Sequence, residues 1–500
     1  MSHWIILPVV LPALIAALLV LARRTDIAVQ RALSMGACAA LLAVAISLIH
    51  AATGAPPEAY HLGNWPAPFG IVLMLDRLSA LMVLLTSVLA LIVLIYAIGA
   101  GWDRKGRHFH ALYQFQLMGI CGAFLTADAF NLFVFFEVLL IASYGLMLHG
   151  GGRDRVRAGF QYVAFNLIGS TLFLFALATV YSVTGTLNMA DLAVKLPTLP
   201  EGDRGLIRVA AVMLLMVFAI KGALVPLHFW LPGTYANAPG VVAALFAVMT
   251  KIGAYAVLRF GTLVFPPGLT ATDGLYGTIL LPAALVTLSV GAIGVLGART
   301  LPRLAAFAAI ASMGTVFVAI AGFRPATTSA ALYYILHSSF AGAVLFLVTD
   351  MVVRRRGDGA MSAGPPGALG GLLAGLFLTA AVASAGMPPL SGFIGKLLVL
   401  SAWTAQAALI WPFVLVATFL MILGFAHAGT TLFWKTAPHL PPATAPVSEP
   451  FAQAAVIGLI GLMTALTILG GPVSAWLDET ASGLHDPSAY IDANRLYEEP

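Results

Sequence analysis

Long apolar segments follow one another along most of this 500-residue chain, and they constrain its fold more than any other feature. A helix needs about 20 consecutive apolar residues to cross a bilayer. The stretch 368–405 is too long for one helix and contains Pro388 and Pro389, so we interpret it as one broken span. The pattern predicts an all-α integral membrane protein with about 14 transmembrane helices. The apolar segments lie at 3–22, 31–52, 77–100, 108–127, 129–149, 158–184, 206–230, 237–262, 275–297, 302–323, 328–352, 368–389, 391–405 with 408–434, and 452–475.

The composition agrees with this class and excludes several functions. Hydrophobic residues make up 60% of the chain and charged residues only 9%, whereas soluble domains contain about 25% charged residues. The longest polar stretches, 53–76, 185–205 and 435–450, are too short to form a nucleotide- or flavin-binding domain. Cys38 and Cys121 lie in separate apolar segments, a pattern that favours neither a disulfide nor a metal cluster. We therefore expect no cofactor and no metal.

Charged residues inside the apolar segments are the strongest indication of function. Lys221, Lys251, Lys396 and Glu137 all interrupt such segments. A charge at bilayer depth costs a few kcal/mol, so ionisable residues in spans mark ion or proton pathways by default. The alternative, purely structural interpretation is a buried ion pair or, for Lys396, a side chain that reaches the membrane surface. The pattern favours a protein that moves charge.

Two of the spans are interrupted next to a lysine, which indicates an internal repeat. Pro226 follows Lys221, and Pro388 and Pro389 precede Lys396, with the two breaks roughly 165 residues apart. Paired broken helices in corresponding halves are typical of inverted repeats with an ion site at the breaks. Spans 7 and 12 are five positions apart in the order, an odd number, so the halves are expected to be inverted. The expected division is 1–107 (three helices), 108–262 (first five-helix repeat), 275–434 (second, inverted repeat), 452–475 (last span) and 476–500 (exposed acidic tail).

The basic residues predict the orientation of the chain. Fifteen of the 25 Lys and Arg residues lie in the loops on one side, seven on the other, and the remaining three are the lysines inside the spans. Because cytoplasmic loops are enriched in Lys and Arg, we expect a multi-pass protein of the cytoplasmic membrane with both termini outside. The first apolar segment has no basic residues before it, so it is expected to stay in the membrane rather than act as a signal peptide. The net charge of +5 then comes from loops at the membrane and gives no indication of nucleic-acid binding.

Several segments together resemble a known family. TADAFNLFVFFEVLLIASYGLM, AIKGALVPLHFWLPGTYANAP, VMTKIGAYAVLRF, ILHSSFAGAVLFL and SAGMPPLSGFIGKLLVL are similar in order and spacing to the proton-translocating antiporter-like family. That family comprises the large membrane-arm subunits of respiratory complex I and their relatives in Mrp-type cation/proton antiporters. The resemblance covers about residues 60–435, and the residues around Glu137 are most similar to the Mrp-type branch.

The resemblance implies a role for each matched residue. It implies a proton pathway formed by the glutamate of the fifth span, the lysines of the broken seventh and central eighth spans, the histidine of the eleventh, and the lysine of the broken twelfth: Glu137, Lys221, Lys251, His337 and Lys396. A carboxylate about 4 Å from an ammonium contributes about 4 kcal/mol at an effective dielectric constant near 20. Forming or breaking a Glu137–Lys221 pair is therefore expected to control whether Lys221 keeps its proton. A core histidine with satisfied hydrogen bonds is the alternative interpretation of His337.

Three functions stay open at this level. The first is a proton-carrying subunit of a multisubunit Na⁺ (or other monovalent cation)/proton antiporter, a secondary transporter rather than an enzyme. The second is a proton-pumping subunit of a redox-driven complex of the complex I or membrane-bound hydrogenase type. The third is a membrane scaffold without conduction. In either active case the resemblance implies other membrane subunits as partners. No span carries paired Asp residues, so the sequence does not indicate whether this subunit or a partner carries the cation.

Overall fold

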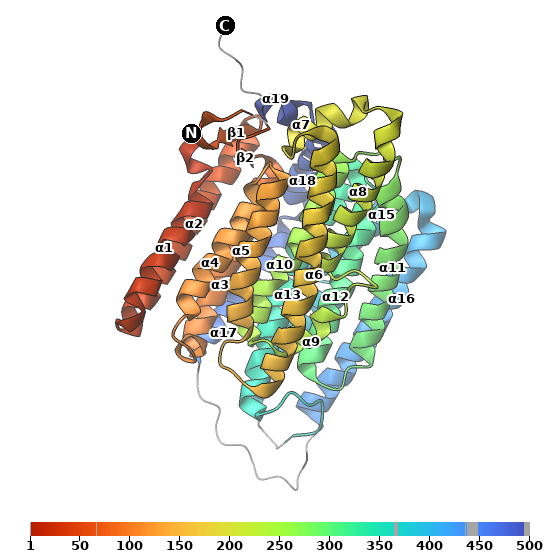
Figure 1. Ribbon diagram of the computed structural model, residues 1–500. Coiled ribbons are helices and arrows are strands. Elements are labelled where there is room, and N and C mark those ends of the chain that lie inside the picture. The colour runs from red at the N-terminus through yellow and green to blue at the C-terminus, as the bar shows by residue number, and fades with distance from the viewer. Residues whose placement is uncertain (1, 67, 365–368, 436, 438–448, 495–500) are drawn as a thin grey trace.

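The computed structural model describes residues 2–66, 68–364, 369–435, 437 and 449–494, which form one bundle of long helices lying side by side (Figure 1). Within these residues the only strands are β1 (Glu58–His61) and β2 (Val72–Leu75), which pair antiparallel with Glu58 opposite Leu75. The prediction of an all-α membrane protein is confirmed. Eleven of the described helices are long and apolar enough to cross a membrane on their own.

Each of the fourteen expected spans is occupied by one helix or by a broken pair of helices. The helices of the bundle are α1 (Leu7–Leu21), α2 (Ile27–Gly54), α3 (Arg77–Gly99), α4 (Phe109–Leu125), α5 (Ala129–Met147), α6 (Arg153–Thr184), α8 (Glu201–Gly222) with α9 (Trp230–Asn237), α10 (Gly240–Arg259), α11 (Leu275–Leu296), α12 (Leu301–Ile320), α13 (Pro325–Arg356), α14 (Gly370–Ala385) with α15 (Ser391–Ala402), α16 (Ala407–Gly429) and α17 (Pro450–Ile468). Three further helices are α7 (Met189–Lys195), α18 (Gly470–His485) and α19 (Ser488–Asn494).

The two broken spans occur where the sequence predicts them. Helix α8 ends at Gly222, and the next residue, Ala223, adopts the left-handed conformation with φ of 55°. Helix α14 ends before Gly386, whose φ is 73° and where an added Cβ would lie 2.7 Å from the Cδ atom of Lys396. Glycine adopts such an angle without strain, and the absence of a side chain leaves room for the lysine. Lys221 thus lies before its break and Lys396 lies after its own.

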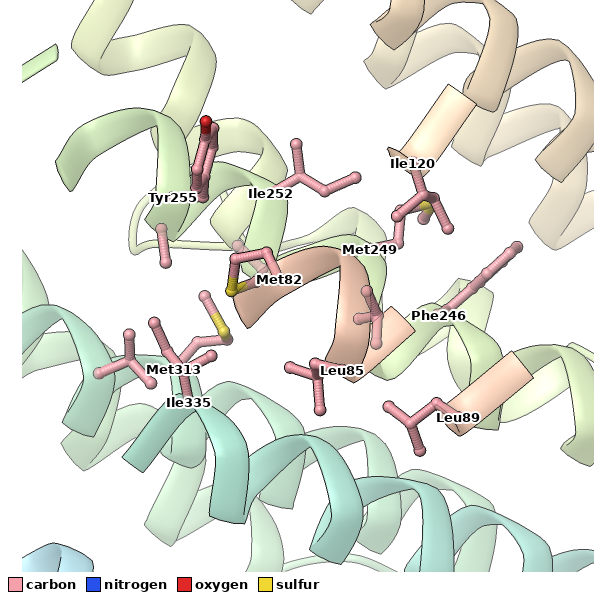
Figure 2. Packing of buried hydrophobic residues seen from close by; sticks show 14 of the residues in the cluster. Met82, Leu85, Leu89, Ile120, Phe246, Met249, Ile252, Tyr255, Met313 and Ile335 are labelled. Atoms are coloured by element: carbon pink, nitrogen blue, oxygen red, sulfur yellow. The ribbon is translucent and has the colours of Figure 1, made fainter. Parts of the chain in front are cut away.

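Burial increases from the edge of the bundle to its centre. Every residue in the most apolar part of α10 and its extension to Val264 is buried, and 94% are buried in that of α13, against 33% in α2, α6, α16 and α17. Met82 and Leu85 of α3 pack beside Phe246 of α10 and Met313 of α12 (Figure 2). The helices that carry Lys251 and His337 therefore lie at the centre, where a charge is enclosed by protein and not by lipid.

The C-terminal segment differs from the exposed tail that we expected over 476–500. Helix α18 packs against α13, and Leu477, Ala481 and Leu484 are buried on one face of it. These residues follow a helical spacing within an otherwise acidic stretch, so the segment is amphipathic and buries its apolar face. Residues 495–500 lie outside the described part of the chain. The other expected domain boundaries stay predictions.

Helix α19 fixes the end of this segment near β1 (Figure 1). Asn494 exchanges two hydrogen bonds, of 3.0 and 3.2 Å, with Asn188 at the start of α7. The ring of Tyr490 lies 4.9 Å from the guanidinium of Arg259, which forms a buried ion pair of 2.7 Å with Asp76. The C-terminal segment therefore covers a buried charge pair at the ends of α3 and α10.

Candidate functional site

Glu137 and Lys221 are each bound by a neutral side chain of α6. Lys221, in the last turn of α8, donates a hydrogen bond of 3.0 Å from Nζ to Oδ1 of Asn166. Glu137, on α5, accepts a hydrogen bond from the hydroxyl of Ser170. Both residues are described, and they form no ion pair with each other in this structure. The Glu137–Lys221 pair, whose formation and breaking the sequence analysis expects to control Lys221, is not formed in this structure, and each residue contacts α6 instead.

Asn166 and Ser170 are one helical turn apart on α6, so they face the same side. The amide nitrogen of Asn166 donates a 2.7 Å hydrogen bond to the carbonyl oxygen of Tyr162, which turns Oδ1 towards Lys221. Sequence reasoning missed both residues. The available signal was a pair of polar residues four positions apart in the apolar segment 158–184.

Lys251 lies near the middle of α10 and is almost completely buried. Within the described chain its ammonium donates only to Sδ of Met313, at 3.2 Å, and a thioether is a weak acceptor. The side chain lines a cavity of about 30 Å³ together with His337, Ser338 and Ser312. We call this the central cavity. One water molecule needs roughly 10–15 Å³, so about two fit.

His337 lies on α13 between the central cavity and the second helix break. Its Nδ1 atom is 2.9 Å from the hydroxyl of Ser391, the first residue of α15. The ring also lies close to Gly392, where an added Cβ would be 2.8 Å from Nε2. The imidazole thus connects the cavity at Lys251 with the start of the helix that carries Lys396.

Lys396 is buried and does not reach the membrane surface. Its Nζ atom donates 2.7 Å hydrogen bonds to the carbonyl oxygen of Ala385 and to the hydroxyl of Thr418 on α16. The carbonyl of Ala385 is free because α14 ends there, so the helix break supplies an acceptor for the ammonium.

The five predicted residues lie on helices that follow one another across the bundle, because α5 packs on α6, α6 on α8, α8 on α10, α10 on α13 and α13 on α15. We call these five residues the band. Helices α8 and α10 approach closely just beyond their lysines, since a Cβ on Gly253 would lie 2.6 Å from the backbone nitrogen of Gly222. Amines, an imidazole and hydroxyls along such a band can hold protons and pass them between neighbours. Among the described residues no group of three or more His, Cys, Asp or Glu side chains is arranged to hold a metal ion.

Comparison with known proteins shows which sequences this chain resembles. The family described as "NADH:quinone oxidoreductase/Mrp antiporter, TM" matches residues 126–423, which include all five residues of the band. The probable D subunit of a K(+)/H(+) antiporter of Rhizobium meliloti (strain 1021) is 37% identical over 98% of this chain and 97% of its own length. The D subunit of a Na(+)/H(+) antiporter of Bacillus subtilis (strain 168) is 34% identical over 99% of both.

Solved structures show the same fold over nearly the whole chain. A chain of the Mrp complex from Dietzia sp. DQ12-45-1b has a TM-score of 0.88 and 27% identity, over 99% of this chain and 100% of its own. A chain of the membrane-bound sulfane sulfur reductase, an archaeal respiratory complex, has a TM-score of 0.88 at 21% identity, over 98% and 99%. A chain of respiratory complex I from Thermus thermophilus has 0.79 at 24%, over 96% and 99%. The last two likenesses concern the fold alone.

Proposed function

The chain belongs to the NADH:quinone oxidoreductase/Mrp antiporter transmembrane family, and we propose from this premise that it is the D subunit of a multisubunit monovalent-cation/proton antiporter. In this proposal it works in the cytoplasmic membrane beside other membrane subunits, with both termini outside. Its part of the exchange is to move protons along the band of Glu137, Lys221, Lys251, His337 and Lys396. The relatives that match it over nearly their full length are named as antiporter D subunits, which supports the antiporter over a redox-driven complex.

The observation that carries the proposal is the run of ionisable side chains, partly buried at Glu137 and buried at the other four positions, with polar neighbours between them. Lys221 is held by Asn166, one turn from the Ser170 that holds Glu137. Charges interact strongly through low-dielectric protein, so loss of the negative charge at Glu137 makes the ammonium form of Lys221 less favourable. Lys221 then releases its proton towards Lys251.

The second half of the path begins at the central cavity. Lys251 exchanges a proton with the cavity, which His337 also lines. His337 contacts the Ser391 hydroxyl at the start of α15. Lys396, five residues further on, then receives the proton between the Ala385 carbonyl and Thr418. Each step joins groups on adjacent helices.

The proposal is tested by a pH-gradient assay in everted membrane vesicles that contain the whole complex. A separate pump energises the vesicles, which are then challenged with Na⁺, Li⁺ or K⁺. We expect cation-dependent collapse of the gradient in the wild type, loss of the collapse in Lys221→Ala, and retention in Lys195→Ala. Lys195 is the matched control because it pairs with Asp191 on the short helix α7, outside the band.

Two results would contradict the proposal. An absence of collapse in the wild type with any of the cations would favour a redox-driven pump. Collapse that survives in Lys221→Ala, at matched assembly, would keep the complex an antiporter and make Lys221 structural.

A further inference from the structure

A second cavity lies at the end of the bundle where α6 begins and α13 ends. It measures about 400 Å³, and its polar and charged lining includes Lys105 between α3 and α4, Arg155 at the start of α6, and Thr349, Asp350 and Arg354 of α13. We call it the inner cavity, because the basic loops predict this side to be cytoplasmic. The hydroxyl of Thr349 has no hydrogen-bond partner within the described chain, although the residue is buried. The inner cavity therefore offers polar contacts to water.

Asp350 fixes the wall of the inner cavity that belongs to α13. Its carboxylate accepts hydrogen bonds from the hydroxyl of Tyr96 (2.7 Å), the indole of Trp102 (3.0 Å) and the guanidinium of Arg354 (2.9 Å). Because every partner is a donor, the carboxylate is held in one place. This wall of the cavity is thus charged and held by several hydrogen bonds.

One face of α13 connects the two cavities. Ser338, Gly342, Phe346 and Asp350 follow one another at intervals of four residues, which places them on the same side of the helix. Ser338 and Gly342 line the central cavity, and Asp350 lines the inner one. Phe346 is the one described residue that lines both. At 1.5 Å per residue, the distance from Asp350 to Ser338 is about 18 Å.

The region between the two cavities is closely packed and apolar. A Cβ on Gly342 would lie 3.5 Å from Cβ of Ala247 on α10, so the two helices nearly touch there. The neighbouring wall of the central cavity is formed by the small side chains of Ala305, Ala308 and Ala309 on α12. The phenyl ring of Phe346 is the largest group at this point, and it has no hydrogen-bonding atom. An apolar constriction of this kind interrupts a chain of water molecules.

The ring of Phe346 is supported by the broken seventh span. It lies edge-on to the ring of Tyr235, with centroids 5.7 Å apart, and Tyr235 also lines the inner cavity. Tyr235 belongs to α9, whereas Lys221 lies on α8, the other half of the same span. A displacement of α9 relative to α13 would therefore move the support of the ring.

We propose that Phe346 is the gate between the inner cavity and the central cavity, closing the proton path from Asp350 to Lys251 and His337 until the ring moves away. The inference rests on the proposed function, since a gate has meaning only where protons pass. It assigns to an apolar residue the control of access from the inner side, while the charged residues carry the proton.

Cysteine labelling tests access without requiring transport. Cys38 and Cys121, both buried, are replaced by alanine, and Ser338→Cys supplies a single reporter in the central cavity. The whole complex is studied in everted vesicles, in which the predicted cytoplasmic face of the protein is exposed to the bath. A small cationic methanethiosulfonate reagent is added to the bath, so that it reaches the inner cavity first. We expect Phe346→Ala to raise the labelling rate roughly tenfold, equivalent to about 1.4 kcal/mol of closure, and Phe346→Trp to lower it.

Phe377→Ala is the matched control, because Phe377 on α14 is equally buried but stacks on Phe433 and lines neither cavity. The labelling rate of Ser338→Cys in the Phe377→Ala protein is expected to equal the rate in the protein that keeps both phenylalanines. Equal rates in Phe346→Ala and Phe377→Ala overturn the gate. If Phe346→Ala does not assemble, Phe346→Leu takes its place, with an intermediate rate expected and an unchanged rate again overturning the proposal. The labelling rates can be measured even if the complex shows no cation-dependent antiport. The gate and the antiporter function can therefore be refuted independently.

Discussion

The replacement of Asn166 by alanine is the sharpest test of how the bundle holds charge at Lys221. The substitution removes the carbonyl oxygen 3.0 Å from Nζ, which is the hydrogen-bond acceptor that the described chain provides for this ammonium. The face of the Phe136 ring, 5.4 Å away, remains. We therefore expect the charged form of Lys221 to become less favourable and antiport to slow.

The magnitude follows from the contact that is lost. A hydrogen bond to a charged group contributes about 1.5–3 kcal/mol net, which corresponds to roughly a ten- to hundredfold change in the population of the charged form. Asn166→Asp changes the charge with the opposite sign, because a carboxylate at this position would hold the proton on Lys221. We expect both variants to transport more slowly than the wild type, the first because Lys221 loads poorly and the second because it releases poorly.

The assay is cation-dependent collapse of the pH gradient in vesicles, normalised to the amount of assembled complex. Thr171→Ala is the matched control, since Thr171 is an exposed neighbour on α6 whose hydroxyl bonds only to the carbonyl of Leu167 within the described chain. A wild-type rate in Asn166→Ala would refute the assignment of Asn166 as the holder of the Lys221 charge.

Two further outcomes concern stability. Leu477→Ala is expected to destabilise the purified complex by about 2–5 kcal/mol in thermal unfolding, because it leaves a cavity at a buried position on α18. The control Leu469→Ala, at an exposed position, is expected to change the stability by no more than about 0.5 kcal/mol. Equal effects of the two substitutions would contradict the packing of α18. Burial raises the pKa of Asp103, but hydrogen bonds from His110 and Arg31 outweigh it, so the pKa lies below its ordinary value. A carboxyl whose pKa is lowered by folding contributes stability above its unfolded pKa of about 3.9 and loses it as the pH falls through the folded value. Asp103→Asn is therefore expected to lower the melting temperature at neutral pH. The melting temperature of the variant is also expected to fall less steeply than that of the wild type below about pH 4. If the melting temperatures of the two proteins fall in parallel, Asp103 is not responsible.

The fold was predictable from the sequence because apolar length alone specifies a membrane-spanning helix. The breaks at Pro226 and Pro388 were equally visible, since proline interrupts the helix ladder. The ends of helices were less predictable. Helix α6 begins at Arg153, before the apolar segment at 158, because a helix continues past the apolar region when its first turn is polar and solvated. The packing of α18 was missed because its apolar face is short and lies in an acidic sequence.

Some residues of the candidate site were likewise predictable from the sequence, and others were not. Lys221, Lys251 and Lys396 were found because a charge among apolar residues is conspicuous. Asn166 and Ser170 were not, because a neutral polar residue in a span is common and the sequence does not show which helix its side chain faces. Met313, the partner of Lys251, carries no sequence signal at all, since its role depends on which helix lies opposite. The roles of the five residues stay predictions until transport is measured.

Helix α10 is enclosed by other helices along its whole apolar length. A bilayer that is too thin or too thick acts on the helices it touches by tilting them or by thinning and thickening around them. Helices such as α6 and α16, with most of their apolar length facing outward, take up that mismatch first. Lipid composition acts on Lys251 only through this surrounding layer of helices, so the central step of the proposed proton transfer is shielded from changes in membrane thickness.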